Sequence, residues 1–211
     1  MKILVIGATG RLGREVMTQA LSHGHRVVAL ARRPAVIALQ HAHLAVVKGD
    51  VLYAPSLGPA CAGVDAVIFA LTRGPSRAPT RVYSDGVRHL LTAMQAAGTR
   101  RLVVVSAEPA GPWAPHPLLR RVVVFPLLHR RFSATYDDLR RMETIVRAST
   151  AQWTILRPPR LLDKPARQAY QLNPDGPLTT GRTLTYADLA TALLDVLGQP
   201  TLLRKAVAVA N

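Results

Sequence analysis

Three glycines between an apolar strand and an amphipathic helix limit the folds that this chain can adopt. The chain opens MKILVIGATGRLGREVMTQAL, in which the apolar run Ile3–Ile6 leads into the glycine segment. Gly7 follows the strand, where a tight turn needs freedom in φ, and Gly10 lets a ligand approach the backbone closely. Gly13 lets the following helix pack against the sheet. This order of strand, glycine turn and helix is the one that a dinucleotide-binding βαβ unit requires.

Strand-like and helix-like segments alternate along most of the remaining sequence. Strands are predicted over residues 2–6, 26–31, 43–47, 66–71, 101–106, 153–157 and 206–210, and helices over 11–22, 55–61, 83–97, 136–149 and 186–197. The strands are nearly continuous apolar runs, which is typical of a parallel sheet covered on both faces. We therefore predict one doubly wound α/β domain over residues 1–211, with the mostly parallel sheet of a Rossmann fold.

Two segments interrupt this alternation. Residues 109–134 hold five prolines within a mixed apolar and basic stretch, and residues 158–184 are rich in proline, glycine and threonine. Each segment follows a predicted strand, and ligands of open α/β sheets bind beyond the carboxyl ends of strands. We expect both to be small insertions that cover a substrate pocket. For residues 109–134, an oligomer contact or a plain surface loop explains the sequence equally well.

The glycine segment also predicts a phosphate site. A helix that begins directly after the turn presents free N–H groups and a partial positive charge to a pyrophosphate. The residues predicted to contact the cofactor here are Gly7, Thr9, Gly10, Arg11, Leu12 and Gly13.

The end of the second predicted strand favours NADP(H) over NAD(H). An NAD site usually has an acidic residue there for the ribose hydroxyls, whereas this chain reads Ala31-Arg32-Arg33-Pro34. Guanidinium groups only donate, and each charge-assisted contact to a 2′-phosphate contributes about 1.5–3 kcal/mol. Arg11 is within reach of the same phosphate or the pyrophosphate. The alternative is that Arg32 and Arg33 are merely solvated.

Two further strand ends are predicted to line the cofactor. Asp50, followed by Val51, is placed to accept from the adenine amino group, although capping a helix is an equally good role for it. The fourth strand ends beside the glycine loop in the usual strand order, so the residues after it should line the ribose and phosphates; these are Ala70, Leu71, Thr72 and Arg73.

Several motifs in order resemble a known family. They read GATGRLG, ARRP, GDV, DDLRRMETIVRAS, QWTILRPPRLLD and TYADLATALLDVL. Together they resemble the atypical short-chain dehydrogenase/reductase group with an NAD(P)H-binding, NmrA-like domain, and within it the biliverdin-IX-beta reductase/flavin reductase type. The resemblance runs from residue 1 to about residue 210.

This resemblance implies where the reactive ring lies. It places the nicotinamide of NADPH beside Ser106 and Ala107, and its carboxamide end beside Pro158, Pro159 and Arg160. It also implies direct hydride transfer to a planar acceptor, with positioning as the main catalytic contribution. Flavin would then be a substrate rather than a bound prosthetic group.

Ser106 and Tyr136 are the candidate catalytic residues. The wider superfamily often uses a Ser-Tyr-Lys set, and here Tyr136 and Arg140 have the Tyr–Lys spacing with Arg in place of Lys. Four residues bring both side chains to one helix face, where a cation lowers the pKa of a tyrosine. Packing is the alternative role for Tyr136. Three functions therefore stay open: a flavin or biliverdin reductase, a Ser/Tyr-assisted carbonyl or sugar-nucleotide oxidoreductase or epimerase, and a non-catalytic NADP-binding redox sensor of the NmrA-like type.

The composition limits the classes of partner that the protein is expected to bind. The net charge is +15, but the arginines are scattered and aromatic residues make up 5%, which argues against nucleic acid binding as the main role. Cys61 is the single cysteine, and the histidines do not form a metal-binding set with carboxylates. No apolar run reaches the length of a bilayer span, and the first strand begins at the N-terminus. We expect a cytoplasmic protein without membrane contact, as a monomer or a homodimer.

Overall fold

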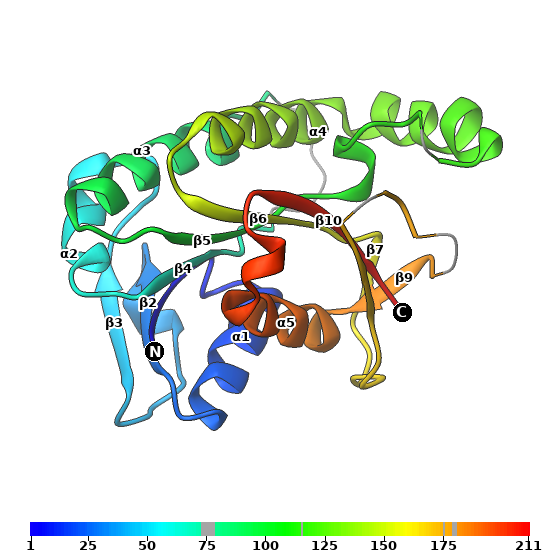
Figure 1. The fold of residues 1–211 in the computed structure, drawn as a ribbon. Helices are drawn as coiled ribbons and strands as arrows, with labels where there is room; N and C mark the ends of the chain where they lie inside the picture. The colour runs from blue at the N-terminus through cyan, green and yellow to red at the C-terminus, as the bar shows by residue number, and fades with distance from the viewer. Residues whose placement is uncertain (73–78, 115, 175, 179–180) are drawn as a thin grey trace.

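A largely parallel sheet forms the centre of the molecule. The structure is a computed structural model that describes residues 1–72, 79–114, 116–174, 176–178 and 181–211. In these residues the main sheet has eight strands, in the spatial order β3 (Leu44–Lys48), β2 (Arg26–Ala31), β1 (Lys2–Ile6), β4 (Ala66–Phe69), β5 (Arg101–Val105), β6 (Gln152–Arg157), β10 (Lys205–Ala210) and β8 (Gln171–Asn173) (Figure 1). β8 pairs antiparallel with β10, and the other pairs in this sheet are parallel. This confirms the predicted doubly wound sheet.

The strand order reverses beside β1. This strand pairs in parallel with β2 on one side and with β4 on the other. The chain therefore winds outward from β1 to β3 and then crosses back to begin the second half at β4. Ligands of such sheets bind outside the carboxyl ends of the strands at this switch point. The residues that follow β1 and β4 meet there.

Helices cover both faces of the sheet. α1 (Arg11–Ser22) and α5 (Tyr186–Asp195) lie on one face, and α2 (Leu57–Cys61), α3 (Val82–Ala96) and α4 (Phe125–Ala148) lie on the other (Figure 1). Successive side chains along a strand point to opposite faces of the sheet, so the core is divided into two layers. In β1, Ile3 and Val5 pack on the α1 side, while Leu4 and Ile6 pack on the α3 side. No helix in the described ranges is long and apolar enough to span a membrane.

Residues 109–134 are mostly helical, which the sequence did not predict. The helix expected over 136–149 begins at Phe125, is kinked at Phe132, and follows a π-helical turn at Arg120–Val124. Pro126 lies one residue into α4, directly after the π-helical turn in which the Arg120 carbonyl accepts from the Phe125 N–H, and it contributes no backbone donor to the helix. Several large apolar side chains of this segment are exposed: Leu118, Leu119, Val122, Val123, Val124 and Leu127.

Residues 158–184 are also more regular than expected. They contain β7 (Arg160–Leu162), β8 and β9 (Thr183–Thr185), and β7 pairs with β9 in a small parallel sheet. Short 3-10 turns lie at Pro34–Val36, Ala54–Ser56, Glu108–Ala110, Val196–Gly198 and Pro200–Leu202. The other predicted elements are confirmed with shifts at their ends. β4 and β5 end slightly earlier than predicted, so Ala70 and Ser106 lie just beyond their strands.

Candidate cofactor and acceptor site

The glycine loop is built from contacts that exclude side chains. Gly7 has a φ of +89°, and a Cβ added there would lie 2.6 Å from the carbonyl oxygen of Ala70. A Cβ on Gly13 would lie 2.2 Å from the carbonyl oxygen of Gly7. α1 therefore packs directly on the loop, and Gly10 caps the helix while its N–H donates to the Gly7 carbonyl at 2.9 Å. The first turn of α1 is left facing the switch point with its N–H groups free of any intrahelical partner.

A cavity of 260 Å³ lies in front of this loop, and we call it the glycine-loop cavity. It reaches from the loop across the carboxyl ends of β2, β3 and β4. Of the residues predicted to bind cofactor, it is lined by Gly7, Thr9, Gly10, Arg32, Asp50, Val51, Leu71 and Thr72. The structure therefore brings these predicted residues together at one cavity.

Five of the predicted residues do not line this cavity. Leu12 and Ala70 are buried in the core, and Gly13 packs on Gly7. Arg11 turns to an exposed ion pair with Asp163, 2.6 Å between Nη1 and Oδ2. Arg33 is exposed outside the cavity, whereas Arg32 is exposed at its rim.

Arg73 lies outside the described residues. Asp50 does not cap a helix, which was its alternative role, because the 3-10 turn Ala54–Ser56 begins after Tyr53. Its Oδ1 accepts from the N–H of Leu52 at 3.0 Å, in the turn after β3. This bond leaves the carboxylate at the cavity wall, so the turn holds it in place.

A second cavity of 160 Å³ continues from the first, and we call it the α4 cavity. The two share Leu71, Thr72 and Tyr83 in their walls. The strand ends contribute Ser106, Ala107, Pro158 and Pro159, and α4 contributes Phe132, Thr135, Tyr136 and Leu139. Of the residues predicted beside the nicotinamide, Ser106, Ala107, Pro158 and Pro159 line this cavity. Arg160 is exposed at the start of β7 and does not line it.

Tyr136 is not activated by Arg140, contrary to the expectation from their spacing. Burial raises the pKa of Tyr136. The Arg140 guanidinium donates to Asp137 Oδ1 at 3.3 Å and to the Pro109 carbonyl at 3.1 Å, and it lies 5.4 Å from the centroid of the Trp113 ring. The cation is therefore held by other partners, and Tyr136 faces the α4 cavity as a protonated phenol that can donate a hydrogen bond.

Ser106 belongs to a buried chain of polar groups that the sequence reasoning missed. Its Oγ donates to Glu143 Oε1 at 2.7 Å, and the same oxygen accepts from Arg157 Nε at 3.0 Å. Arg157 Nη2 donates to the other oxygen, Oε2. Because its proton goes to Glu143, the Ser106 hydroxyl offers its remaining lone pairs as acceptors. Glu143 therefore fixes the direction in which the Ser106 hydroxyl donates its proton.

A sequence signal for Glu143 exists. It lies on the buried stripe of α4 that also holds Leu139, Met142 and Val146. A carboxylate in such a stripe is costly to bury without partners, so its presence indicates a buried cation or donor nearby. The partner, Arg157, comes from a different strand, and its position is set by the sheet.

Asp138 connects α4 to the start of α3. It is fully buried, and its carboxylate accepts from the N–H groups of Tyr83 and Ser84 at 3.0 and 3.3 Å and from Ser84 Oγ at 2.5 Å. An acidic group at a helix N-terminus satisfies free donors and interacts favourably with the helix dipole. This contact holds Tyr83, which lines both cavities, against α4.

Comparisons with known proteins agree with this geometry. The model of a family described as NAD(P)H-binding matches residues 7–200. The photosystem II assembly factor Ycf39 of Synechocystis is 36% identical over 123 residues, which is 56% of this chain but only 37% of that protein. This chain thus matches little more than a third of that relative's length.

Two solved structures have the same fold over the whole chain. A short-chain dehydrogenase/reductase from Veillonella parvula in complex with NADP has a TM-score of 0.81 at 18% identity, with 94% of it covered. ChuY, an anaerobillin reductase from Escherichia coli O157:H7, has a TM-score of 0.80 at 21% identity, with 97% covered. At these identities the likeness shows the fold alone.

Proposed function

The chain belongs to the NAD(P)H-binding family, and from this premise we propose that it is an NADPH-dependent reductase that transfers hydride to a flat acceptor such as a flavin or a linear tetrapyrrole. The observation that carries the proposal is the continuity of the two cavities through Leu71, Thr72 and Tyr83. A dinucleotide held by the glycine loop would extend along these residues to Ser106 at the second cavity.

The glycine-loop cavity fits a dinucleotide phosphate. Its loop is packed so closely that a side chain at Gly7 or Gly13 would collide with the backbone of Ala70 or Gly7 and displace the loop, and the free N–H groups of α1 face the cavity. Arg32 at the rim supplies the positive charge that a 2′-phosphate requires, which favours NADPH over NADH. The Veillonella relative in complex with NADP is consistent with this preference.

The α4 cavity supplies a surface for a flat acceptor. Phe132, Tyr136 and Leu139 face the cavity from α4, and Pro158 and Pro159 face it from beyond β6. Bound nicotinamide supplies the hydride, and these apolar walls exclude water while they position the acceptor. Ser106, oriented by Glu143, is placed to accept a hydrogen bond from the carboxamide or the acceptor.

The test is NADPH oxidation with FMN, riboflavin or biliverdin as acceptor. Tyr136→Phe removes only the phenolic oxygen, and direct hydride transfer predicts that kcat/KM stays within about threefold of the parent value, as for loss of one neutral hydrogen bond. The matched control is Tyr53→Phe, because Tyr53 is exposed outside the α4 cavity. The absence of turnover with every acceptor, despite NADPH binding, would contradict the proposal and favour a non-catalytic redox sensor.

One observation favours a second candidate. Ser106 and Tyr136 line the same cavity, as an enzyme acting on a carbonyl or a sugar nucleotide would require. That reading predicts turnover of a carbonyl substrate that falls by about 100-fold or more in Tyr136→Phe, because the phenol would then be the proton donor. The hydrogen bonds from Arg140 to Asp137 and to the Pro109 carbonyl weigh against this second candidate. They hold the Arg140 guanidinium, so it does not lower the pKa of Tyr136.

A further inference from the structure

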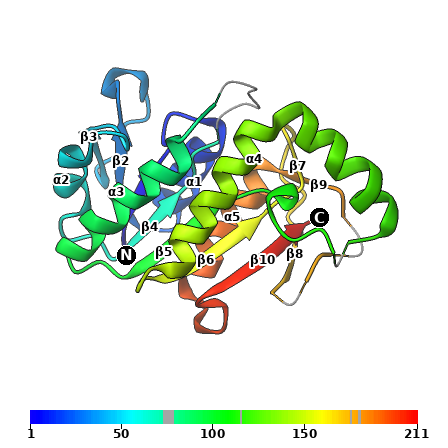
Figure 2. The ribbon, with the colours of Figure 1, turned by 90° about the horizontal axis from the view of Figure 1, so that it is seen from above.

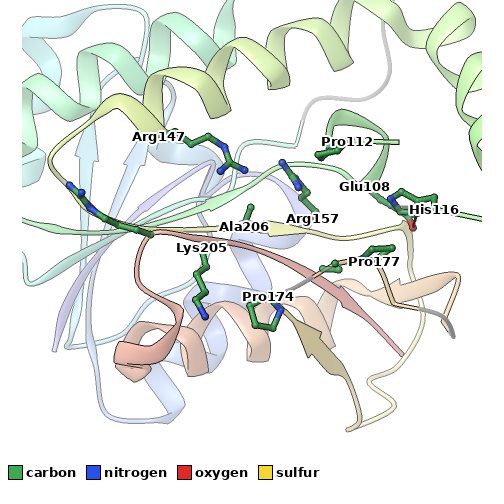
Figure 3. A pocket seen from close by; sticks show the side chains of 13 residues that line it. Glu108, Pro112, His116, Arg147, Arg157, Pro174, Pro177, Lys205 and Ala206 are labelled. Atoms are coloured by element: carbon green, nitrogen blue, oxygen red, sulfur yellow. Dashed lines mark ion pairs between the residues drawn. The ribbon is translucent and has the colours of Figure 1, made fainter. Parts of the chain in front are cut away.

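A third cavity, of 420 Å³, lies over β10 on the α4 side of the sheet (Figure 3). We call it the β10 cavity, and we infer that it binds a small anionic ligand, a molecule that carries a carboxylate or phosphate group. This inference goes beyond the proposed reductase function, because the ligand is neither the nucleotide nor the hydride acceptor.

The cavity exists because β10 presents small side chains to a face that no helix within the described residues covers. Ala206 and Ala208 line it, while Val207 and Val209 point to the opposite face and pack in the core with α1 and α5. Figure 2 shows α4 passing above β5 and β6 and leaving β10 in view. Pro174 and Pro177, which follow β8, form the outer wall. A volume of this size is typical of small-molecule sites.

Arg147 and Arg157 are two of the three arginines in the cavity wall; the third, Arg204, donates to the Ser149 carbonyl at 3.3 Å. Ala208 is the register partner of Arg157, so the Arg157 side chain leaves the sheet on the cavity face. Arg147 comes from α4, and its Nη2 lies 3.6 Å from Glu143 Oε2. The two guanidinium groups therefore share one carboxylate, and Figure 3 shows both reaching into the same space, with Lys205 directed away. Glu108, also in the wall, is ion-paired with Arg120. One positive charge remains without a counterion in this set.

A buried polar atom also lacks a partner at this cavity. The His116 side chain is 7% exposed, its Nδ1 has no hydrogen bond among the described residues, and Glu108 Oε1 is 3.6 Å away. Burial lowers the pKa of His116, and Arg120 and Arg157 lower it further. The ring is therefore neutral, and one of its nitrogens is left unsatisfied, which is rare for a buried group. His116 is therefore a neutral group in the cavity wall, and an anion in the cavity would be held by the arginines beside it.

Gly111 holds Arg157 at the cavity wall. A Cβ on Gly111 would lie 2.9 Å from Arg157 Cζ and 2.9 Å from Nη1. The loop after β5 thus lies directly against the guanidinium plane. With Nε and Nη2 on Glu143, Arg157 Nη1 forms no hydrogen bond in the part of the chain that the structure describes. It is the donor that a carboxylate or phosphate oxygen would accept.

The ligand is a separate molecule because a wall divides this cavity from the α4 cavity. Ser106 and Arg157 bond to the same oxygen of Glu143, so one buried carboxyl group separates the two spaces. The 3-10 turn Glu108–Ala110 completes the wall. It is fastened by the bond from the Glu108 N–H to the Pro158 carbonyl at 2.9 Å.

The experiment is calorimetric titration with inorganic phosphate and, separately, with succinate. Ionic strength is held constant with sodium chloride, and the protein is saturated with NADP⁺ so that the glycine loop is filled. We expect saturable heat with at least one of the two anions, and which one binds distinguishes a phosphate from a carboxylate ligand. Heat with neither anion would overturn the inference, as would heat seen only when NADP⁺ is left out.

Variants locate the site. Arg147 is 45% exposed, so Arg147→Gln should fold normally, and we expect it to weaken anion binding by about tenfold or more through loss of a charge-assisted contact. Arg26→Gln, at the exposed start of β2, makes the same change in net charge and should bind like the parent. Gly111→Ala, which forces the Arg157 guanidinium to move, should weaken binding as well. Equal affinities in Arg147→Gln and Arg26→Gln would refute the assignment.

Tryptophan emission provides a readout that reductase activity does not affect. The Arg147 guanidinium lies 5.4 Å from the centroid of the Trp153 ring. In a Trp113→Phe background Trp153 is the remaining tryptophan, so an anion that draws Arg147 into the cavity should change its emission. Failure of the reductase assay would leave this signal intact. An unchanged spectrum at saturating anion would count against the site.

Discussion

The glycine-loop cavity and the α4 cavity are neighbours, but they are built from different parts of the chain. The first is shaped by backbone, with Gly7 and Gly13 in contact with main-chain atoms. The second is shaped by side chains from α4 and the ends of β5 and β6, oriented by the bonds between Ser106, Glu143 and Arg157. We therefore expect a side chain added to the backbone of the glycine-loop cavity to disrupt that cavity. In the second, the outcome should depend on which group is removed.

The largest effect is expected at Gly13. Gly13→Ala places a Cβ 2.2 Å from the Gly7 carbonyl oxygen, so α1 must move away from the loop. We expect NADPH affinity to fall by about 100-fold or more, together with a loss of about 2–3 kcal/mol in the free energy of unfolding. Calorimetry measures the NADPH affinity, and denaturant unfolding measures the free energy of unfolding. Gly58→Ala is the control, since a Cβ there meets nothing within 4 Å; equal behaviour of the two variants would contradict the backbone role.

Glu143 tests whether side-chain bonds organise the second cavity. Glu143→Gln removes the charge that neutralises Arg157 while it keeps the size of the side chain. An unpaired buried cation is expected to lower the free energy of unfolding by about 3 kcal/mol. Asp137→Asn is the control, because the Asp137 side chain is 44% exposed and its ion pairs are solvated. Denaturant midpoints that are the same for both variants would show that Glu143 does not organise this region.

Substitutions of Arg32 and Arg33 test the role of charge in the glycine-loop cavity. Arg32→Asp should reduce NADPH affinity by about 10- to 100-fold, the value of one charge-assisted contact, with little effect on NADH. Arg33→Asp changes the net charge identically, but its side chain is outside the cavity, so its effect should be clearly smaller. Binding titrations of both variants with NADPH and with NADH measure these affinities. Equal losses in the two variants would mean that only the overall charge matters.

The smallest effect concerns the pH dependence of Tyr136. Burial raises the pKa of its phenol, so the folded protein keeps Tyr136 protonated at pH values up to and beyond its ordinary titration range near 10. The profiles of kcat/KM against pH for wild type and Tyr136→Phe should therefore be parallel between about pH 7 and 9.5, offset by no more than about threefold. A wild-type limb in this range that Tyr136→Phe lacks would show that Tyr136 titrates in catalysis.

Local sequence was a good guide wherever a contact lies within one strand–turn–helix unit. The helix at residues 11–22 and the loop before it were predicted correctly, because Gly7, Gly10 and Gly13 constrain atoms only a few residues away. The seven parallel strands of the main sheet were also located, since each is a nearly continuous apolar run, whereas the short strands β7, β8 and β9 were not predicted. The helical start of α4 was not predicted, because the five prolines of residues 109–134 suggested a loop, whereas the helical path passes through Pro126.

What the sequence by itself determined is the doubly wound sheet and the backbone cradle at its switch point. Both follow from hydrophobic period and glycine placement, which are properties of neighbouring residues. Only the tertiary structure decided that Arg11 pairs with Asp163, that Arg140 is held by Asp137 and Pro109, and that Glu143 joins Ser106 to Arg157. Charged side chains are long and choose partners in space. Their roles therefore depend on which strand ends and helices the fold brings within a few ångströms.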